Sequence, residues 1–407
     1  MRAFVSSPGA GAGDWTLRVL NSTGNAPFNG GPAGNFNSSG ANHSFFDGAA
    51  WNDNASSDVS FKLDYARCYP AGSGAWVVSG VEYCEGEEIV LDANLSVLSG
   101  GSLTLENATV YLNQPALSPA ANGSRNLTVY SGGSLFVRDS DSDSSTWSDA
   151  SLLSSAYGGS PYNGVYFVFN VEQGASFEFE CSELSRAGYE LAEAGSFVGF
   201  EPFRPAGLRI AANWSNVTDS RVHDCFTGAL LFEASNCNVS SNEYWDNSVA
   251  VRVFDGSQDN EFSYNSLNSS VQQHFYVDNA SYNNFSRNTA WLAGSDAFYF
   301  TNGARNNSAW YNNASHNGGA GFLAGDDSDD VSLYWNNASY NSVYGARFED
   351  STTRPGEVGY NTFSRSLPGP VASVSCGLYA EARYAYGVHH NFFGHQENGF
   401  CLDLSGV

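Results

Sequence analysis

Apolar and polar residues alternate in short segments over residues 204–398, and the same pattern returns at nearly constant intervals. A recurrent asparagine marks each copy, and successive copies lie 23, 23, 24, 24, 25 and 30 residues apart. An apolar residue stands three positions before and two positions after each asparagine, as Val239 and Tyr244 do around Asn242. The asparagine column consists of Asn242, Asn265, Asn288, Asn312, Asn336 and Asn361, followed by Asn391.

A repeat of this length without a 3.6-residue period predicts a solenoid built of strands. Each turn of the solenoid, here called a rung, adds one strand to every sheet, and rungs stack at about 4.8 Å. Like residues then lie on like residues, so the asparagines should form a ladder of amide side chains that bond to those above and below. We therefore expect an all-β chain in which this column is structural.

The strand and turn of each copy, clearest from Gly228 to Asn242, resemble the repeat of the right-handed parallel β-helix family. This family includes pectate-lyase-like enzymes, a periplasmic β-helix linked to copper-enzyme maturation, and many surface proteins. The resemblance implies a right-handed parallel β-helix, or β-solenoid, of roughly ten or more rungs. It specifies fold far better than function, because one fold hosts many activities.

Three regions differ in composition. Residues 1–74 form an arm rich in Gly, Asn and Ser, in which only Trp15–Leu20 and Val59–Tyr65 alternate like strands. Residues 75–203 repeat a Gly-Gly-Ser-Leu turn at wider steps, which predicts irregular rungs with inserted loops. Residues 204–407 hold the regular rungs.

The chain of 407 residues has a formal net charge of −25, which disfavours nucleic acid and anionic membranes as partners. No segment approaches the ~20 apolar residues of a membrane-spanning helix. Met1 to Asp14 lacks the apolar core of a signal peptide, so a leader has been removed or is absent from this chain.

Seventeen Asn-x-Ser/Thr sequons exceed chance and predict an N-glycosylated extracellular or cell-surface protein. The alternative is that Asn and Ser are the residues that β-helix turns require. The sequon asparagines are Asn21, Asn37, Asn42, Asn54, Asn94, Asn107, Asn122, Asn126, Asn213, Asn216, Asn238, Asn268, Asn279, Asn284, Asn306, Asn313 and Asn337.

Seven cysteines fit the same compartment, because structural disulfides persist outside the cytosol. Cys68 and Cys84 flank a Pro-Gly turn region, and Cys376 and Cys401 lie about one rung apart, so both pairs are candidate disulfides. The other three cysteines cannot all pair, and the sequence does not determine the connectivity.

Two acidic sets are candidate calcium ligands. Asp139, Asp141 and Asp143 alternate like the first ligands of a calcium loop, with Asp149 beyond them; the alternative is a solvated acidic loop. The second set is a column expected at the exit of the first strand of each rung, where stacked like charges would splay, take up protons or share cations. It consists of Glu233, Asp255, Asp278, Asn302, Asp326 and Glu349.

A β-helix with acids along one groove also resembles polysaccharide lyases, which use calcium and a basic residue. Here Arg252 and Arg347 are the only basic residues on those strands and are expected in different columns, so the resemblance fails at the base. His389, His390 and His395 could bind copper or zinc. Strand alternation would put the first two on opposite faces, which favours a hydrogen-bonded turn histidine instead.

These observations predict a structural extracellular β-solenoid, a surface or filament subunit that assembles head-to-tail. The alternative is a carbohydrate-binding or carbohydrate-cleaving β-helix that uses exposed aromatic residues such as Trp147, Trp291 and Tyr299 with the acidic column. An enzyme is disfavoured; it would be a polysaccharide lyase or a glycosidase. Expected partners are other copies of the chain and glycans, and calcium is the one expected cofactor.

Overall fold

The computed structural model describes residues 2–6, 16–20, 34–35, 43–46, 51–54, 60–61, 68, 74–112, 125–143, 145–147, 150–155, 167–188, 207–325, 327–349, 354–364, 376–381, 387–394 and 398–403. The chain divides into two compact units, Met1–Arg67 and Cys68–Val407. None of the described residues forms a helix long and apolar enough to cross a membrane.

The first unit contains short strands in antiparallel pairs. These strands outnumber the two strand-like segments expected from the sequence. The pairs in its described part are β1 (Arg2–Ser6) with β2 (Thr16–Leu20), β3 (Gly34–Asn35) with β6 (Ser60–Phe61), and β4 (His43–Phe46) with β5 (Trp51–Asn54).

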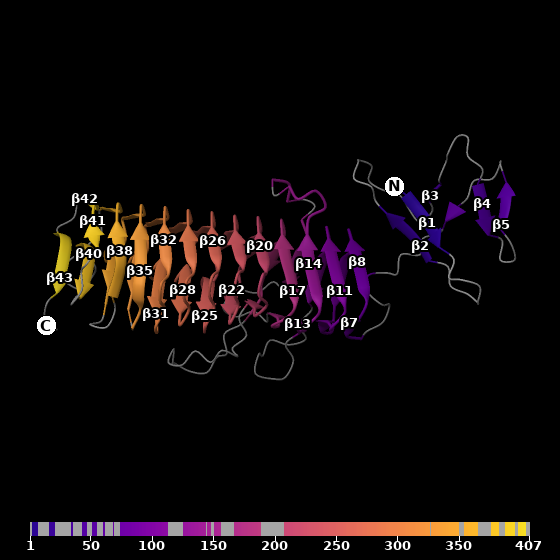
Figure 1. Cartoon of the computed structure of the whole chain (residues 1–407), viewed down its shortest axis with the longest axis horizontal. Coiled ribbons are helices and arrows are strands. Elements are labelled where there is room, and N and C mark those ends of the chain that lie inside the picture. The colour runs from indigo at the N-terminus through magenta and orange to yellow at the C-terminus, as the bar shows by residue number, and fades with distance from the viewer. Residues whose placement is uncertain are drawn as a thin grey trace. The chain divides into compact units, whose positions relative to one another are not determined.

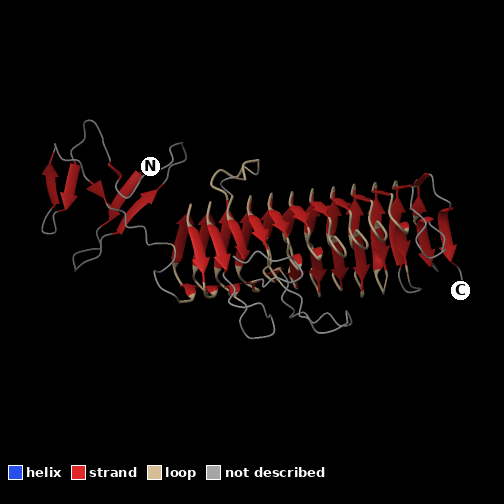
Figure 2. Ribbon diagram, turned by 180° about the vertical axis from the view of Figure 1, so that it is seen from behind, coloured by secondary structure: helices blue, strands red, loops and turns tan. Residues whose placement is uncertain are grey.

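The second unit is a right-handed parallel β-helix, which confirms the predicted fold (Figures 1 and 2). Its described strands form three long parallel sheets. The first sheet comprises β7 (Trp76–Val78), β10 (Leu95–Val97), β13 (Asn126–Val129), β16 (Val168–Val171), β19 (Leu208–Ile210), β22 (Thr227–Phe232), β25 (Val249–Phe254), β28 (Phe275–Asp278), β31 (Phe298–Thr301), β34 (Phe322–Ala324), β37 (Tyr344–Phe348), β40 (Cys376–Glu381) and β43 (Asn398–Asp403).

The second sheet comprises β8 (Val81–Glu85), β11 (Ser102–Glu106), β14 (Ser134–Arg138), β17 (Ser176–Glu180), β20 (Asn216–Thr218), β23 (Asn238–Ser240), β26 (Glu261–Ser263), β29 (Asn284–Ser286), β32 (Ser308–Trp310), β35 (Asp329–Tyr334), β38 (Arg354–Gly359) and β41 (Val388–His389). The third sheet comprises β9 (Glu88–Leu91), β12 (Thr109–Leu112), β15 (Leu152–Ser155), β18 (Glu183–Ser185), β21 (Arg221–His223), β24 (Glu243–Trp245), β27 (Ser266–Asn268), β30 (Thr289–Trp291), β33 (Asn313–Ser315), β36 (Asn337–Ser339), β39 (Thr362–Ser364) and β42 (Phe392–Gly394).

Alternate residues of every strand point inward, and each inward position adds one column of side chains to the interior. Phe275, Phe298 and Phe322 stack along the first sheet with ring centres 4.8 Å apart. Phe262 and Phe285 stack at 4.8 Å along the second sheet and meet the first column edge-on. All five side chains are buried, so the apolar column runs along the axis of the solenoid.

The asparagine column lies buried in the turn between the second and third sheets. Asn265 Nδ2 donates to the Val239 carbonyl of the preceding rung at 2.8 Å and to Asn288 Oδ1 of the next rung at 3.0 Å. The backbone N–H of Asn265 donates to the same Oδ1 at 3.0 Å. Each side chain therefore satisfies backbone groups that the turn buries away from water.

Two further asparagine ladders occupy the other turns, and neither was predicted from the sequence. Asn260 and Asn283 repeat the same pair of hydrogen bonds in the turn after the first sheet, at 3.1 and 2.9 Å. Asn317 and Asn341 repeat it in the turn after the third sheet, at 3.0 Å for both bonds. Buried backbone groups at each corner of the rung are thus satisfied by one side-chain type.

We predict that Asn288→Ala lowers the free energy of unfolding by about 1–3 kcal/mol, because it removes the buried acceptor of the Asn265 backbone N–H and side-chain amide and the donor to the Phe262 carbonyl. Denaturant unfolding of the full chain measures this change. Asn216→Ala, at an exposed position of β20, serves as the control and should change the free energy by less than about 0.5 kcal/mol. Equal values for the two variants would contradict a stabilising role for the ladder.

Candidate functional site

The outer face of the third sheet changes character along the solenoid. In later rungs its side chains are mostly Ser, Thr and Asn, whereas β18, β21 and β24 carry charged and aromatic side chains. We call the group formed by Glu183, Arg221, His223, Asp224 and Glu243 the His223 cluster.

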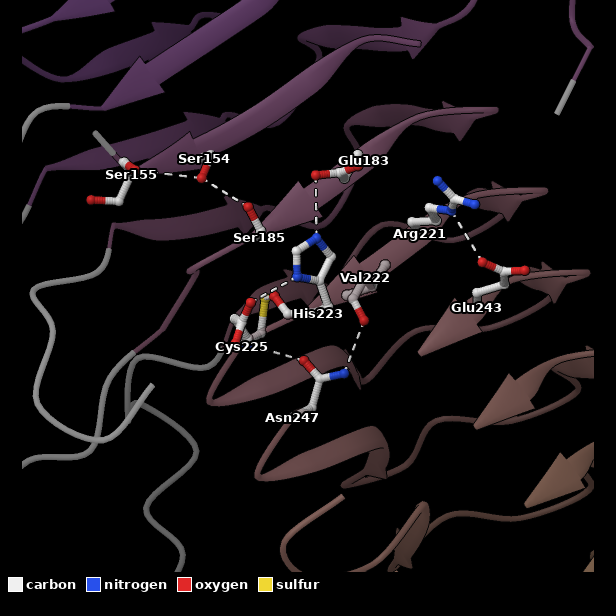
Figure 3. A network of polar contacts seen from close by, with 11 residues as sticks. Ser154, Ser155, Glu183, Ser185, Arg221, Val222, His223, Cys225, Glu243 and Asn247 are labelled. Carbon is white, nitrogen blue, oxygen red and sulfur yellow. Dashed lines mark hydrogen bonds and ion pairs between the residues drawn. The ribbon is translucent and has the colours of Figure 1, made fainter. Parts of the chain in front are cut away.

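His223 lies between two carboxylates (Figure 3). Its Nδ1 is 2.9 Å from Asp224 Oδ2 and its Nε2 is 3.2 Å from Glu183 Oε1. Burial by itself would lower the imidazole pKa, but the hydrogen bonds and charges of both carboxylates together raise it above the ordinary value of 6.5. The Trp245 ring stacks on the imidazole, with ring centres 4.2 Å apart and planes 8° from parallel.

Arg221 connects this group to the inserted loop. Its Nε donates to Glu243 Oε2 at 3.0 Å, and its guanidinium lies 3.7 Å from the ring centre of Trp147. Stacking of a guanidinium on an indole adds attraction to simple contact. Trp147 therefore lies against the third sheet although it is distant in sequence.

The cluster is suited to binding and poorly suited to proton transfer. Both ring nitrogens of His223 are engaged by carboxylates, so neither is free to accept a proton from a substrate. Cys225 is also unsuited to nucleophilic chemistry, because burial raises the pKa of its thiol to about 12. The carboxylates of Glu183 and Glu243 are 31% and 53% exposed and remain available as hydrogen-bond acceptors.

A second surface feature lies on the turn between the second and third sheets. Each rung places there, just before the buried asparagine, a residue with positive φ whose side chain points outward. Over six rungs these side chains form a stack that we call the aromatic ridge: Tyr264, Arg287, Tyr311, Trp335, Tyr360 and His390.

The contacts within the aromatic ridge are regular. Ring centres are 5.1 Å apart from Tyr311 to Trp335, 5.2 Å from Trp335 to Tyr360 and 4.8 Å from Tyr360 to His390. The guanidinium of Arg287 lies 5.3 Å from the ring centre of Tyr264 and 5.6 Å from that of Tyr311. The ridge is thus continuous, and its side chains are exposed.

The acidic column expected from the sequence is out of register. Asp278 lies beside Phe254 and Thr301, and Glu349 follows Phe348, which pairs with Ala324; Glu233 and Asp255 therefore belong to a neighbouring column. The cause is that rung length varies by one residue. A residue found by counting a fixed number of positions along the sequence therefore lies one position away from the residue that actually pairs across the rungs. Asp326 lies outside the described residues.

The variation in rung length also changes the predicted positions of the arginines. Arg252 and Arg347, which were expected in different columns, occupy one column of the first sheet together with Tyr276 and Tyr299. Asp278 is buried beside this column, and burial raises the pKa of its carboxyl. Trp291 stands on the third sheet, so the structure does not bring Tyr299 and Trp291 to one face.

The Asp139 loop uses its carboxylates on its own backbone. Asp139, Asp141 and Asp143 each accept from the backbone N–H two residues further on, at 3.5, 3.0 and 2.9 Å. The hydrogen bond from Ser145 lowers the pKa of Asp143. Asp149 lies outside the described residues, and no group of three His, Cys, Asp or Glu side chains among those described could hold a metal ion.

His389 and His390 come together, contrary to the expectation from strand alternation. Their Nδ1 atoms are 2.9 Å apart, because His390 has a φ of 52° and belongs to the turn rather than to the strand. His389 Nε2 also lies 2.6 Å from Glu357 Oε1. His395 is outside the described part of the chain.

Cysteines and sequons are also located by the structure. Cys68 and Cys84 form a disulfide, and Cys376 is disulfide-bonded, while the side chain of Cys401 lies outside the described residues. Cys181, Cys225 and Cys237 are free and buried.

None of the sequon asparagines whose side chains are described is buried: Asn94, Asn213, Asn216, Asn279, Asn306, Asn313 and Asn337 are exposed, and Asn107, Asn126, Asn238, Asn268 and Asn284 are half-buried. The side chains of Asn21, Asn37, Asn42, Asn54 and Asn122 lie outside the description.

Neither the His223 cluster nor the aromatic ridge was predicted from the sequence. A usable signal for the cluster was the triplet Arg221-Val-His223, which breaks the Ser, Thr and Asn pattern of later third-sheet strands. For the ridge, the signal was an aromatic or arginine residue immediately before the ladder asparagine in successive copies.

We predict that the His223 cluster stabilises the fold most between about pH 4.5 and about pH 6.5. The contribution of His223, whose pKa is raised, is fully present below 6.5 and is lost as pH rises through its folded pKa. The contribution of Glu183, whose pKa is lowered chiefly by its hydrogen bond to His223, is present above 4.5 and is lost as pH falls through its folded pKa.

Unfolding free energies across this pH range measure the effect. His223→Phe keeps a ring against Trp245 and should remove the loss of stability on the alkaline side. His316→Phe is the matched control, because His316 stacks on Tyr340 at 4.7 Å and is exposed. If the stability of His223→Phe depends on pH as that of the parent does, the interaction of His223 with Asp224 and Glu183 is not the source of that pH dependence.

Comparison with solved structures places this fold among known β-helix proteins. A mutant of the periplasmic alginate epimerase AlgG is 12% identical with a TM-score of 0.53, covering 76% of this chain and 78% of that one. A double mutant of AlgG is 13% identical with a TM-score of 0.52, covering 78% and 85%. The mannuronan C-5 epimerase AlgE6 A-module of Azotobacter vinelandii is 10% identical with a TM-score of 0.48, covering 82% and 90%. At such identities the likeness shows the fold alone.

A search among curated proteins found no match. Residues 204–367 match the family model described as periplasmic copper-binding protein (NosD). This segment contains the asparagine ladders and most of the regular rungs described above. The chain is accordingly a right-handed parallel β-helix protein whose residues 204–367 match the NosD family model.

Proposed function

We propose that this chain is an exported, carbohydrate-binding β-helix that holds an uncharged glycan at the His223 cluster. One observation carries the proposal: Trp147 stacks on Arg221, which is hydrogen-bonded to Glu243, beside the stacked pair of His223 and Trp245. Aromatic rings together with half-exposed charged groups are the elements that bind a sugar, which has apolar C–H faces and a rim of hydroxyls.

The charges of the cluster favour a neutral ligand. Glu183, Asp224 and Glu243 supply three carboxylates, against the Arg221 guanidinium and, when it is protonated, the His223 imidazolium. The formal net charge of the whole chain is −25, which would repel a polyanion at long range. Hydroxyls can donate to the exposed carboxylates and accept from the guanidinium without this cost.

Binding is favoured over cleavage because His223 is occupied on both sides by carboxylates. The structural neighbours include alginate epimerases, whose name refers to a polysaccharide, and this supports a glycan ligand only at the level of fold. The proposal therefore rests on the cluster and does not transfer an epimerase reaction to this chain.

The family name refers to copper, and the described residues do not fit a copper centre. His389 and His390 supply two imidazoles with Nδ1 atoms 2.9 Å apart, yet within the described chain no third His, Cys, Asp or Glu completes a metal-binding group. The free thiols of Cys225 and Cys237 have pKa values raised by burial to about 12 and about 11, which disfavours the thiolate needed for ligation. We derive no copper step from this chain.

A location outside the cytosol is supported by the Cys68–Cys84 disulfide and by the periplasmic description of the matched family. N-glycosylation, calcium binding and head-to-tail assembly stay predictions from the sequence. The first is compatible with the unburied sequon asparagines.

The function is tested by probing an array of immobilised neutral and acidic glycans with the full chain. We expect retention on neutral glycans and at least a tenfold loss for Trp147→Ala, because the aromatic partner of Arg221 is removed. Trp214→Ala is the control, since Trp214 is 72% exposed on the turn between the first and second sheets. If Trp147→Ala is retained as strongly as the parent, or if the parent binds no glycan, glycan binding at the His223 cluster is contradicted.

A further inference from the structure

The aromatic ridge has a composition and a placement that packing of the interior does not explain. Its rings are outside the core, with Tyr264, Tyr311, Trp335 and Tyr360 exposed by 57%, 46%, 46% and 45%. All of them occupy left-handed backbone positions, where Asn or Gly fits at lower cost than an aromatic residue. Single exposed aromatic residues are ordinary, whereas a contiguous exposed patch marks an interaction surface.

A second row of rings lies beside the ridge on the second sheet. The Trp310 ring is tilted by 35° against Tyr311, with centres 6.1 Å apart, and the Tyr334 ring is tilted by 36° against Trp335 at 5.7 Å. Trp310 and Tyr334 are register partners on adjacent strands. Two successive rungs therefore present the same pair of inclined rings, displaced by one strand spacing.

The repeat of this surface restricts the shape of its ligand. Contacts recur at 4.8–5.6 Å along the solenoid axis, and they do so over the six rungs of the ridge. A ligand that uses several rungs must itself be linear and repetitive. A pyranose unit is about as long as one rung is high, and its C–H groups and hydroxyls match ring edges, phenol groups and indole N–H groups.

Charge decides between linear polymers. Described ionic groups at the ridge are few: Arg287 lies within it, and two carboxylates lie beside it on the second sheet. Glu261 accepts from Asn284 and Ser286, and Glu357 is held by Tyr334 and His389. Among the described side chains no run of cations neutralises a polyanion there, and the chain as a whole is strongly acidic. The same acidity opposes close approach of a second copy of the chain.

We propose that the aromatic ridge is a second binding site, a track on which an uncharged linear polysaccharide lies parallel to the solenoid axis with about one sugar per rung. The site is separate from the His223 cluster, because the ridge begins at Tyr264, after β26, and runs toward the C-terminus, whereas the cluster belongs to β18, β21 and β24. It does not depend on glycan binding at that cluster.

Affinity electrophoresis of the full chain in gels containing soluble hydroxyethyl cellulose tests the proposal. The parent should be retarded, and Trp335→Ala should weaken the apparent affinity at least tenfold by interrupting the stack. Trp310→Ala removes a ring outside the stack and should weaken binding even where Trp335→Ala perturbs folding. Tyr282→Ala is the matched control: Tyr282 is 58% exposed with a φ of 60°, but stands on the turn between the first and second sheets.

Trp147→Ala should be retarded like the parent, which separates this site from the His223 cluster. Three results would overturn the proposal: a parent that is not retarded, equal loss in Tyr282→Ala, or sedimentation of the parent as a dimer that Trp335→Ala converts to a monomer. The last would make a second copy of the chain the occupant of the ridge.

Discussion

Burial of the turn backbone is the constraint on which this fold depends. A three-sheet solenoid turns its chain at three corners per rung, and each corner leaves backbone N–H and C=O groups beside an apolar interior. Asparagine meets the constraint because one side chain both donates and accepts. Asn288 Nδ2 donates to the Phe262 carbonyl at 2.9 Å and to Asn312 Oδ1 at 3.0 Å, so each rung satisfies its neighbours and stability is shared along the stack.

Because buried asparagine side chains hold the turn backbone from the interior, the outward-facing side chains of the turns are free to vary. The residue before each ladder asparagine adopts positive φ and faces outward, so its side chain is not chosen by the core. Tyr311, Trp335 and Tyr360 occupy such positions, and the ladder holds them at the rung spacing. The aromatic ridge is therefore an outward consequence of the buried amides, and its regularity is inherited from them.

The His223 cluster depends on the same scaffold in another way. Glu183 and His223 face each other because they stand on adjacent third-sheet strands, offset by one outward position. Trp147 reaches Arg221 from an inserted loop whose length the solenoid tolerates, since loops leave the stack without changing its register. A regular interior thus supports an irregular site.

The sequence alone determined the β-helix, the ladder at Asn242 to Asn361 and its approximate rung length, because side-chain alternation and repeat spacing are properties of local sequence. It did not determine the neighbours on the outer faces. Counting placed Asp278 in a column with Asp255, yet Asp278 pairs with Phe254, because a turn that gains one residue moves all that follows to the next position. Only the tertiary structure fixes how much chain each turn absorbs, and hence which side chains, such as Glu183 and His223, meet across rungs.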